Sequence, residues 1–143
     1  MGPGKIVVGI DGSPTSLRAA AYAVGLAKRQ RSRLVVVFVR PQQSGMVSLA
    51  DSYGAAVASV VEAQNEMETE FRDTIVREKP RIGVDIEMMV RYGDPFSELC
   101  QAAKELRADA VVVGRSESTL HRFAGSVAQR LVRCGRWPVT VVP

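Results

Sequence analysis

The sequence predicts an α/β fold, namely a doubly wound, five-stranded parallel sheet with helices on both faces. Short apolar runs rich in β-branched residues recur along the chain, as expected of strands that are buried on both faces. These runs alternate with longer segments in which apolar residues follow helical spacing. Right-handed crossovers that place helices on both faces make the strand order reverse once, which predicts the order 3-2-1-4-5.

The first apolar run, Lys5–Ile10, is expected to be a strand that ends at an Asp-Gly turn. Ser13 is expected to cap a helix, because its hydroxyl can accept a hydrogen bond from a free backbone N–H group. Pro14 suits the first helical position, where no N–H group is needed. Apolar residues at helical spacing, beginning with Leu17, predict that this helix runs to about residue 31.

The second apolar run, Leu34–Val39, predicts another interior strand. A polar connection that contains glycine and serine is expected over residues 42–54. A long amphipathic helix is then predicted over residues 55–79, and Pro80 is expected to end it because proline lacks the N–H group. Val84–Tyr92 alternates only partly between apolar and polar residues, so it is expected to be an edge strand.

The rest of the chain repeats the alternation of strand and helix. Asp94 and Pro95 form a second pair of capping residue and first-turn proline, and the helix they begin leads to a fourth strand, Ala110–Val113. Val127 begins a short helical pattern that Gly135 is expected to end. Residues 137–142 are the predicted fifth strand.

Composition limits the function. A chain of 143 residues, 46% hydrophobic and 24% charged, fits a single domain over residues 1–143. No apolar run approaches the roughly 18–20 residues that span a bilayer, and no leader is visible, so a cytoplasmic protein that binds no membrane is expected. Cys100 and Cys134 are expected to be buried free thiols, and a single histidine argues against a His/Cys metal site.

Two glycines after the fourth strand mark the best candidate for a ligand site. Gly114 follows the strand, and Gly125 with Ser126 opens the next helix. Glycines allow the backbone to approach a phosphate, and the free N–H groups of a helix N-terminus attract anions. The alternative is that both glycines serve only as turn residues. Ser126 likewise is either a phosphate-binding hydroxyl or a plain helix cap.

The same region is basic. Between residues 114 and 136 a single acidic residue, Glu117, stands against five arginines: Arg115, Arg122, Arg130, Arg133 and Arg136. This excess suits a polyanionic ligand such as a nucleotide, although a solvated helix face explains the last three equally well. Nucleic acid is not an expected partner, because no recognition motif is present and aromatic residues make up only 6% of the chain.

In the order 3-2-1-4-5 the loops after the first and fourth strands face each other across one crevice. Asp11 follows the first strand, so its carboxylate would meet a sugar hydroxyl; the alternative is a turn residue bonded to its own loop. The backbone near Val39 would reach a base, and amides after Gly114 would meet phosphates. Only Asp11 ends a central strand, and His121 is expected in a loop, so no catalytic or metal-binding residues are expected.

Several of these pieces occur together in a known pattern. They are, in chain order, Ile10-Asp11-Gly12-Ser13-Pro14, Gly93-Asp94-Pro95, Val113-Gly114, Gly125-Ser126-Val127 and Pro138-Val139-Thr140-Val141-Val142. In this order and spacing they resemble the universal stress protein family over essentially the whole chain. The resemblance implies a Rossmann-like fold of the adenine-nucleotide alpha-hydrolase type and adenine-nucleotide binding or stress signalling. It also implies a homodimer that pairs through the last strand, Val139–Val142.

Members of the family that bind ATP have a G-x2-G-x9-G-[S/T] pattern after the fourth strand, and this chain departs from it. Gly114 matches the first glycine and Gly125-Ser126 the last pair, but Glu117 occupies the middle glycine position and the loop is two residues shorter. A carboxylate about 5 Å from a phosphate, at an effective dielectric constant near 20, costs roughly 3 kcal/mol. Arg115 or Arg122 could offset this repulsion, or the Glu117 side chain could point outward.

The sequence therefore predicts a non-catalytic stress-response protein, similar to universal stress proteins, with a degenerate adenine-nucleotide-binding crevice. ATP or another adenine nucleotide, with Mg²⁺, is the expected ligand. The residues expected to bind it are Asp11, Val39, Gly114, Arg115, Gly125, Ser126 and Val127. The alternatives are a dimeric regulatory module that binds no ATP and, less favoured, a weak nucleotide hydrolase.

Overall fold

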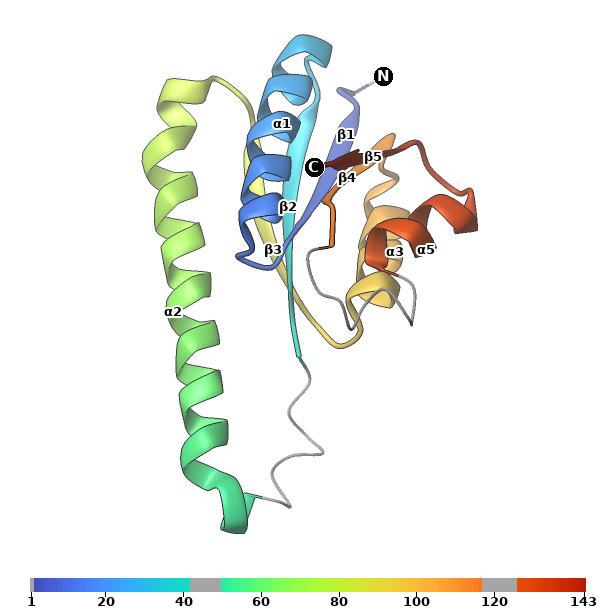
Figure 1. Ribbon diagram of the computed structural model, residues 1–143. Helices are drawn as coiled ribbons and strands as arrows, with labels where there is room; N and C mark the ends of the chain where they lie inside the picture. Colours follow the sequence, from blue (N-terminus) through green and yellow to red (C-terminus); the bar gives the residue numbers. More distant parts are fainter. Residues whose placement is uncertain (1, 42–49, 117–125) are drawn as a thin grey trace.

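The chain forms a five-stranded sheet in the order β3-β2-β1-β4-β5, in which every neighbouring pair of strands is parallel. The computed structural model describes residues 2–41, 50–116 and 126–143. The strands are β1 (Lys5–Ile10), β2 (Arg33–Arg40), β3 (Ile86–Tyr92), β4 (Ala110–Gly114) and β5 (Val139–Val142). The helices are α1 (Pro14–Gln30), α2 (Ala50–Ile82), α3 (Pro95–Leu106) and α5 (Val127–Cys134). The predicted fold class and strand order are confirmed (Figure 1).

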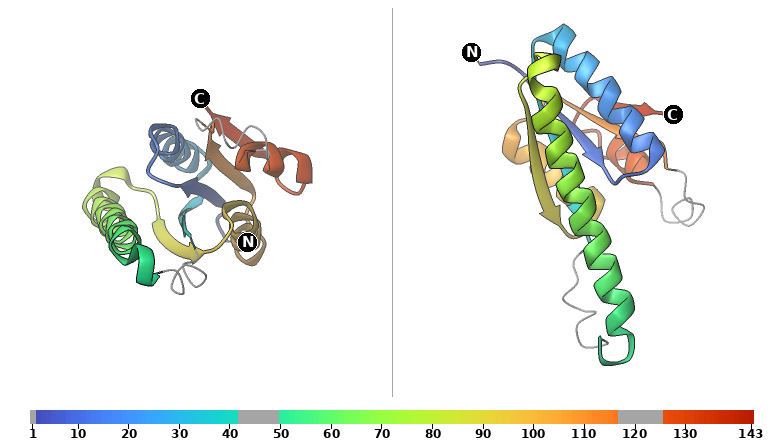
Figure 2. Two further views of the ribbon diagram at one scale, coloured as in Figure 1. Left: turned by 60° about the horizontal axis from the view of Figure 1, so that its bottom comes forward. Right: turned by 90° about the vertical axis from the view of Figure 1, so that its left-hand side faces the viewer.

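β1 lies at the centre of the sheet, and its side chains alternate between two helical layers. Val7 pairs with Val35 of β2 on one side and with Val111 of β4 on the other. Ile6 and Val8 pack under α1 and α2, whereas Val7 packs against α3 and α5 on the opposite face. Figure 2 shows the two layers of helices on either side of the sheet. Because both faces are covered, the interior positions of the central strands are apolar, with charged residues only at the ends of β1 and β2, and this pattern made the strands predictable.

Three helices begin with the side-chain caps that the sequence predicts. In each, a side-chain oxygen accepts a hydrogen bond from a backbone N–H group three residues later. The pairs are Ser13 with Ser16 at 3.2 Å, Asp94 with Ser97 at 2.9 Å, and Ser126 with Gln129 at 3.2 Å. These helices follow β1, β3 and β4, so all three N-termini lie at the C-terminal edge of the parallel sheet.

Asp94 is expected to contribute to stability in a pH-dependent way. The backbone N–H of Ser97 lowers the pKa of Asp94 below its ordinary value of 3.8, with smaller help from Arg130, whose Nη1 lies 3.6 Å away. The ionised form is therefore favoured in the folded state, so this contribution is present above the unfolded pKa and is lost as pH falls through the folded one. Asp94→Ala should lower the free energy of unfolding by about 1 kcal/mol at neutral pH.

Urea unfolding of the wild type and of Asp94→Ala at neutral and acidic pH measures this contribution. The difference between them should shrink as the pH falls below the folded pKa. Asp94→Asn is the control, because an asparagine cap keeps its hydrogen bond to the backbone and loses only the charge. A difference that stays constant with pH would contradict a role for the charge.

α2 is longer than the sequence predicts. It begins at Ala50, inside the stretch expected to be a polar connection, and residues 42–49 of that stretch lie outside the described residues. The expectation that Pro80 ends the helix is wrong, since α2 continues to Ile82. Pro80 removes one hydrogen bond in the last turn, and Ile75 and Ile82, which pack against the core on either side of it, hold that turn in place. β3 starts at Ile86, two residues later than expected.

α1 lies against the sheet through small side chains. Ala19, Ala23 and Ala27, which are four residues apart, have no exposed surface. The expectation that Leu17 belongs to the apolar face is wrong, since Leu17 is 48% exposed. Residues at intervals of four share one face of a helix, and this face begins at Thr15, so position 17 points away from the sheet.

α2 covers β2 and β3, and its N-terminal part extends beyond their C-terminal ends (Figures 1 and 2). Arg40, the last residue of β2, links α2 to this end of the sheet. Nη1 of Arg40 lies 3.4 Å from Oε1 of Glu68 in α2, and the Arg40 side chain is only 11% exposed. The Arg40 guanidinium also lies 5.6 Å from the centre of the Tyr92 ring. Met67 covers the loop after β1, because a Cβ atom at Gly12 would lie 2.7 Å from its sulfur.

Candidate functional site

A cavity of about 330 Å³ opens at the C-terminal edge of the sheet, between the ends of β1 and β4. Its walls come from the ends of β1, β2 and β4, from the first turn of α1, and from the first turns of α3 and α5. The strand order reverses between β1 and β4, and in open parallel sheets ligands bind in the crevice at this point. The expectation that the loops after β1 and β4 face one crevice is therefore confirmed.

The loop after β1 gives the cavity its polar wall. Oδ1 of Asp11 accepts a hydrogen bond from the backbone N–H of Ser13 at 2.9 Å, and the backbone N–H of Asp11 donates to Oγ of Ser16 at 3.3 Å. The Asp11 carboxylate is thus a turn residue and is also exposed at the cavity wall. The two roles that the sequence left open for Asp11 are therefore compatible.

Gly114 is required where β4 meets α1. A Cβ atom there would lie 2.6 Å from the carbonyl carbon of Thr15 and 2.8 Å from the backbone nitrogen of Ser16, closer than atoms can approach. The Thr15 hydroxyl also donates a hydrogen bond to the carbonyl oxygen of Arg115 at 2.8 Å. The start of α1 and the end of β4 are therefore held together as one unit at the cavity.

An apolar wall lies opposite these polar groups. Val37 and Val39 of β2, Leu99 of α3, and Val127 and Ala128 of α5 all line the cavity. Leu99 comes so close to β1 that a Cβ atom at Gly9 would lie 2.9 Å from its Cδ1. Ligand pockets are mostly apolar with a few fixed polar groups, and the cavity has this composition.

The N-terminus of α5 separates the cavity from an adjoining hollow. Ser126 is buried and caps the helix, and it lines the hollow rather than the cavity. Three residues, Arg115, Ser116 and Ala128, line both spaces. Arg133 lines the hollow but not the cavity. The hollow is therefore basic and lies beside the free N–H groups of a helix, an arrangement that favours anions.

The structure brings together most of the residues that the sequence proposed. Asp11, Val39, Gly114, Arg115 and Val127 line the cavity, and Ser126 lines the adjoining hollow. Gly125, Glu117, His121 and Arg122 lie outside the described residues.

Comparison with known proteins connects this geometry to a family. The model of the universal stress protein family matches residues 3–143. The chain belongs to the universal stress protein family.

Similar proteins cover nearly the whole of this universal stress protein chain. A universal stress protein from Synechocystis is 31% identical over 152 residues, which cover 99% of both chains. A solved universal stress protein in complex with cAMP is 25% identical, with a TM-score of 0.66, and the match covers 98% of this chain and 96% of the other. The UspA protein from Lactobacillus plantarum is 19% identical and has the same fold, with a TM-score of 0.73 over 98% of this chain and 97% of the other.

Sequence reasoning missed several residues that line the cavity of this universal stress protein. Thr15 and Ser16 are polar but only 4% exposed, and their position in the helical turn after a central strand could have identified them. Pro95 and Leu99 of α3 reach the cavity only because α3 packs beside α5 on the same face of the sheet. No local sequence signal carries that information.

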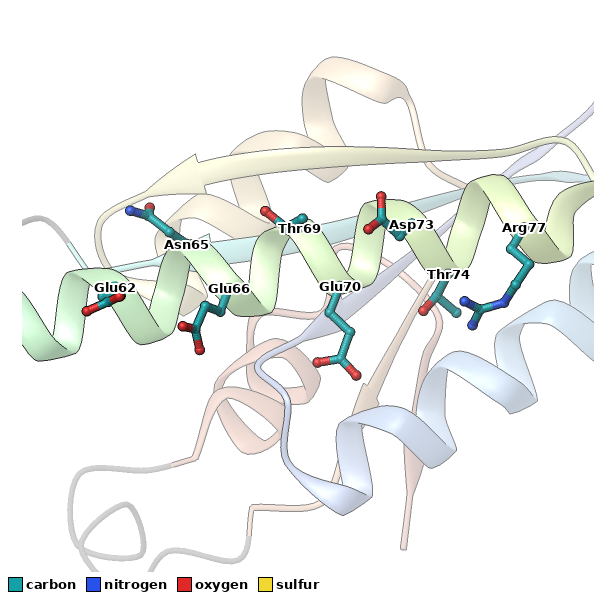
Figure 3. A pocket seen from close by; sticks show the side chains of 8 residues that line it. All are labelled: Glu62, Asn65, Glu66, Thr69, Glu70, Asp73, Thr74 and Arg77. Atoms are coloured by element: carbon teal, nitrogen blue, oxygen red, sulfur yellow. The ribbon is translucent and has the colours of Figure 1, made fainter.

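A second hollow lies on α2, away from the crevice, and it is unsuited to an anion. All of its residues belong to one helix: Glu62, Asn65, Glu66, Thr69, Glu70, Asp73, Thr74 and Arg77 (Figure 3). The hollow contains four carboxylates and one guanidinium, so a nucleotide phosphate would be repelled. This hollow is best described as the solvated, acidic face of α2.

Two other kinds of site do not occur in the described residues 2–41, 50–116 and 126–143. These residues contain no cluster of three or more His, Cys, Asp or Glu side chains that could hold a metal ion. None of the helices described there is long and apolar enough to cross a membrane.

Proposed function

We propose that this universal stress protein binds an adenine nucleotide in the cavity between β1 and β4 and acts without catalysis, as one domain over residues 1–143. The observation that carries the proposal is the cavity itself, which combines an exposed carboxylate, an apolar wall and an adjoining basic helix N-terminus. The similar structure in complex with cAMP supports an adenine nucleotide as the ligand.

The size of the cavity suits the base and ribose of a nucleotide. Its volume of about 330 Å³ lies near the lower end of the range for ligand pockets, roughly 300–1,000 Å³. In the proposed complex the base lies against Val39 and Leu99, and Asp11 accepts a hydrogen bond from the ribose. The phosphate lies toward Arg115 and the N-terminus of α5, where Ser126 is the cap.

The described lining of the cavity supports the proposal that the protein acts without catalysis. Among the described residues that line the cavity, Asp11 and Arg115 are the ionisable ones. Hydrolysis would need a positioned base or metal-binding carboxylates, and the bond to Ser13 already occupies Oδ1 of Asp11. We therefore expect ATP incubated with the protein and Mg²⁺ to remain intact, and we propose the cytoplasm, where adenine nucleotides are available, as its location.

Asp11 is the residue through which binding is best tested. Calorimetric titration with AMP, cAMP and ATP, with and without Mg²⁺, should detect binding of at least one of the three nucleotides. Asp11→Ala should weaken binding by about 10- to 100-fold, because a hydrogen bond to a charged group contributes about 1.5–3 kcal/mol.

The control for this titration is Asp11→Asn. Its amide oxygen can still accept the hydrogen bond from Ser13, so the loop keeps its shape and only the charge is lost. Binding by Asp11→Asn should therefore lie between that of the wild type and that of Asp11→Ala. No heat with any of the three nucleotides at millimolar concentration would overturn the proposal.

A homodimer through β5 is a second proposal, and the position of this strand favours it. β5 pairs with β4 on one side, and no strand in the described part of the chain pairs with its other side. Val141 of β5 is 41% exposed and Val132 of the adjacent α5 is 57% exposed, so the open edge is apolar. An unpaired apolar edge strand is a template for pairing with a second chain.

Val141→Lys should separate the two chains of the proposed dimer. A symmetric contact would bring two new ammonium groups to the same edge, which should raise the dimer dissociation constant at least about tenfold. Light scattering after size-exclusion chromatography gives the mass directly. Val76→Lys, at a 73% exposed position on α2, adds the same charge elsewhere and should leave the mass unchanged. A wild-type protein that elutes as a monomer would refute the dimer.

A further inference from the structure

α3 and α5 pack on one face of the sheet, and both begin at its C-terminal edge, because each connects parallel strands. Arg130 of α5 fixes their register. Its guanidinium lies 4.2 Å from the centre of the Phe96 ring, and its Nη1 lies 3.6 Å from Oδ2 of Asp94. The second turn of α5 therefore faces the first turn of α3.

One helical turn beyond this contact, each helix carries a cysteine. Cys100 follows Phe96 by four residues, and Cys134 follows Arg130 by four residues. Residues four apart share a face of a helix, so Cys100 lies on the face of α3 that carries Phe96, and Cys134 lies on the face of α5 that carries Arg130. Since these two faces contact each other, both thiols lie on the sides of α3 and α5 that face one another.

The electrostatics of Cys100 agree with this placement. Burial raises the pKa of the Cys100 thiol, and hydrogen bonding and charge interaction with the thiol of Cys134 raise it further. Cys134 donates a hydrogen bond to the carbonyl oxygen of Leu131 at 3.1 Å. Both cysteines are free and partly exposed, so a small oxidant can reach them.

We propose that Cys100 and Cys134 form a dithiol that peroxide converts into a disulfide joining α3 to α5. The thiolate of one cysteine attacks a peroxide oxygen, which gives a sulfenic acid and, after protonation of the leaving hydroxide, water. The sulfur of the other cysteine then attacks the sulfenic sulfur, forms the S–S bond and releases a second water. Overall, two thiols are oxidised and one hydrogen peroxide is reduced to two waters.

The disulfide would act directly on the wall of the cavity. Leu99 lies next to Cys100 in the chain and lines the cavity, as do Val127 and Ala128 from the first turn of α5. A covalent bond would fix the spacing of these two helices. It would also close the loop between positions 100 and 134, which should raise the melting temperature by about 5–10 °C. This inference does not depend on nucleotide binding.

The test is oxidation of the reduced, full-length protein with one equivalent of hydrogen peroxide, the amount that the proposed reaction consumes and that limits oxidation of the five methionines. The intact mass should fall by two hydrogen atoms, the number of free thiols should fall from two to none, and a thiol reductant should reverse both changes. A digest should contain one peptide pair that joins positions 100 and 134. Oxygen atoms added at Cys100 or Cys134 in the digest without a bond between them, or a bond between two chains, would overturn the proposal.

Cys100→Ser and Cys134→Ser are matched controls, because serine keeps the size and shape of cysteine. Each variant should give the circular dichroism spectrum of the wild type, gain oxygen under peroxide, and show no rise in melting temperature. If either variant shows the same rise as the wild type, the rise does not come from a bond between these thiols. Nucleotide titrations of the reduced protein are a separate experiment, so failure of one proposal leaves the other intact.

Discussion

Phe38→Ala is expected to lower the free energy of unfolding by about 3–5 kcal/mol, the largest effect that we expect from a single substitution. The side chain is 1% exposed on β2, and its ring meets the Phe71 ring of α2 edge to face, with the centroids 5.3 Å apart. Removing it leaves a void beneath α2 and also removes an aromatic pair. Since the free energy of unfolding of small domains is only about 5–15 kcal/mol, the variant should retain little of its stability.

Urea unfolding followed by circular dichroism measures this loss. Val76→Ala is the control, because Val76 also belongs to the β2–α2 half of the molecule but is 73% exposed, so its change should stay within about 0.5 kcal/mol. A loss below about 1 kcal/mol in Phe38→Ala would mean that α2 moves in to fill the void.

Gly114→Ala is expected to cost about 1–3 kcal/mol and to disturb the cavity as well. The added methyl group would lie 2.6–2.8 Å from backbone atoms of Thr15 and Ser16, and a backbone cannot rotate away as a flexible side chain can. α1 must therefore move from β4, which also strains the hydrogen bond from the Thr15 hydroxyl to Arg115. Thermal unfolding and nucleotide titration should both change.

Two other glycines provide controls for the effect of space. A Cβ atom at Gly2 or at Gly135 meets nothing within 4 Å. Gly135 has a φ of 61°, so Gly135→Ala carries a conformational cost of about 1–2 kcal/mol without any contact, whereas Gly2→Ala should be neutral. A neutral Gly114→Ala variant would show that the approach of α1 to β4 can relax freely.

The sequence was sufficient to predict the sheet and the starts of the three capped helices α1, α3 and α5, because both depend on local chemistry. The start of α2, which carries no such cap signal, was not predicted. Strands buried on two faces have continuous apolar runs in the sequence. A serine or aspartate followed by a proline predicts a helix start, and α1 and α3 do begin at such pairs. The errors have a common cause. Pro80 and Leu17 were judged by their own preferences, whereas packing of α2 and the alanine face of α1 decided their places.

The candidate site was predictable in so far as strand ends define it. Asp11, Val39 and Gly114 end neighbouring strands, and the strand order alone brings them to one edge. Leu99 reaches the same cavity through the packing of α3, which no spacing in the sequence encodes. The pairing of Cys100 with Cys134 is similar, since it depends on the register of two helices that Arg130 sets.

The length of α2 has a consequence for local stability. Its 33 residues extend about 50 Å, whereas the eight residues of β2 extend about 26 Å, so much of the helix has no sheet beneath it. Ahead of Met67, where contact with the β1 loop begins, positions 58–60, 62, 63, 65 and 66 are exposed. The backbone amides there should exchange through local fraying of the helix, whereas those near Phe71 should exchange only when the whole domain unfolds. Hydrogen exchange should therefore slow progressively along this one helix, from its first turns toward Ile75.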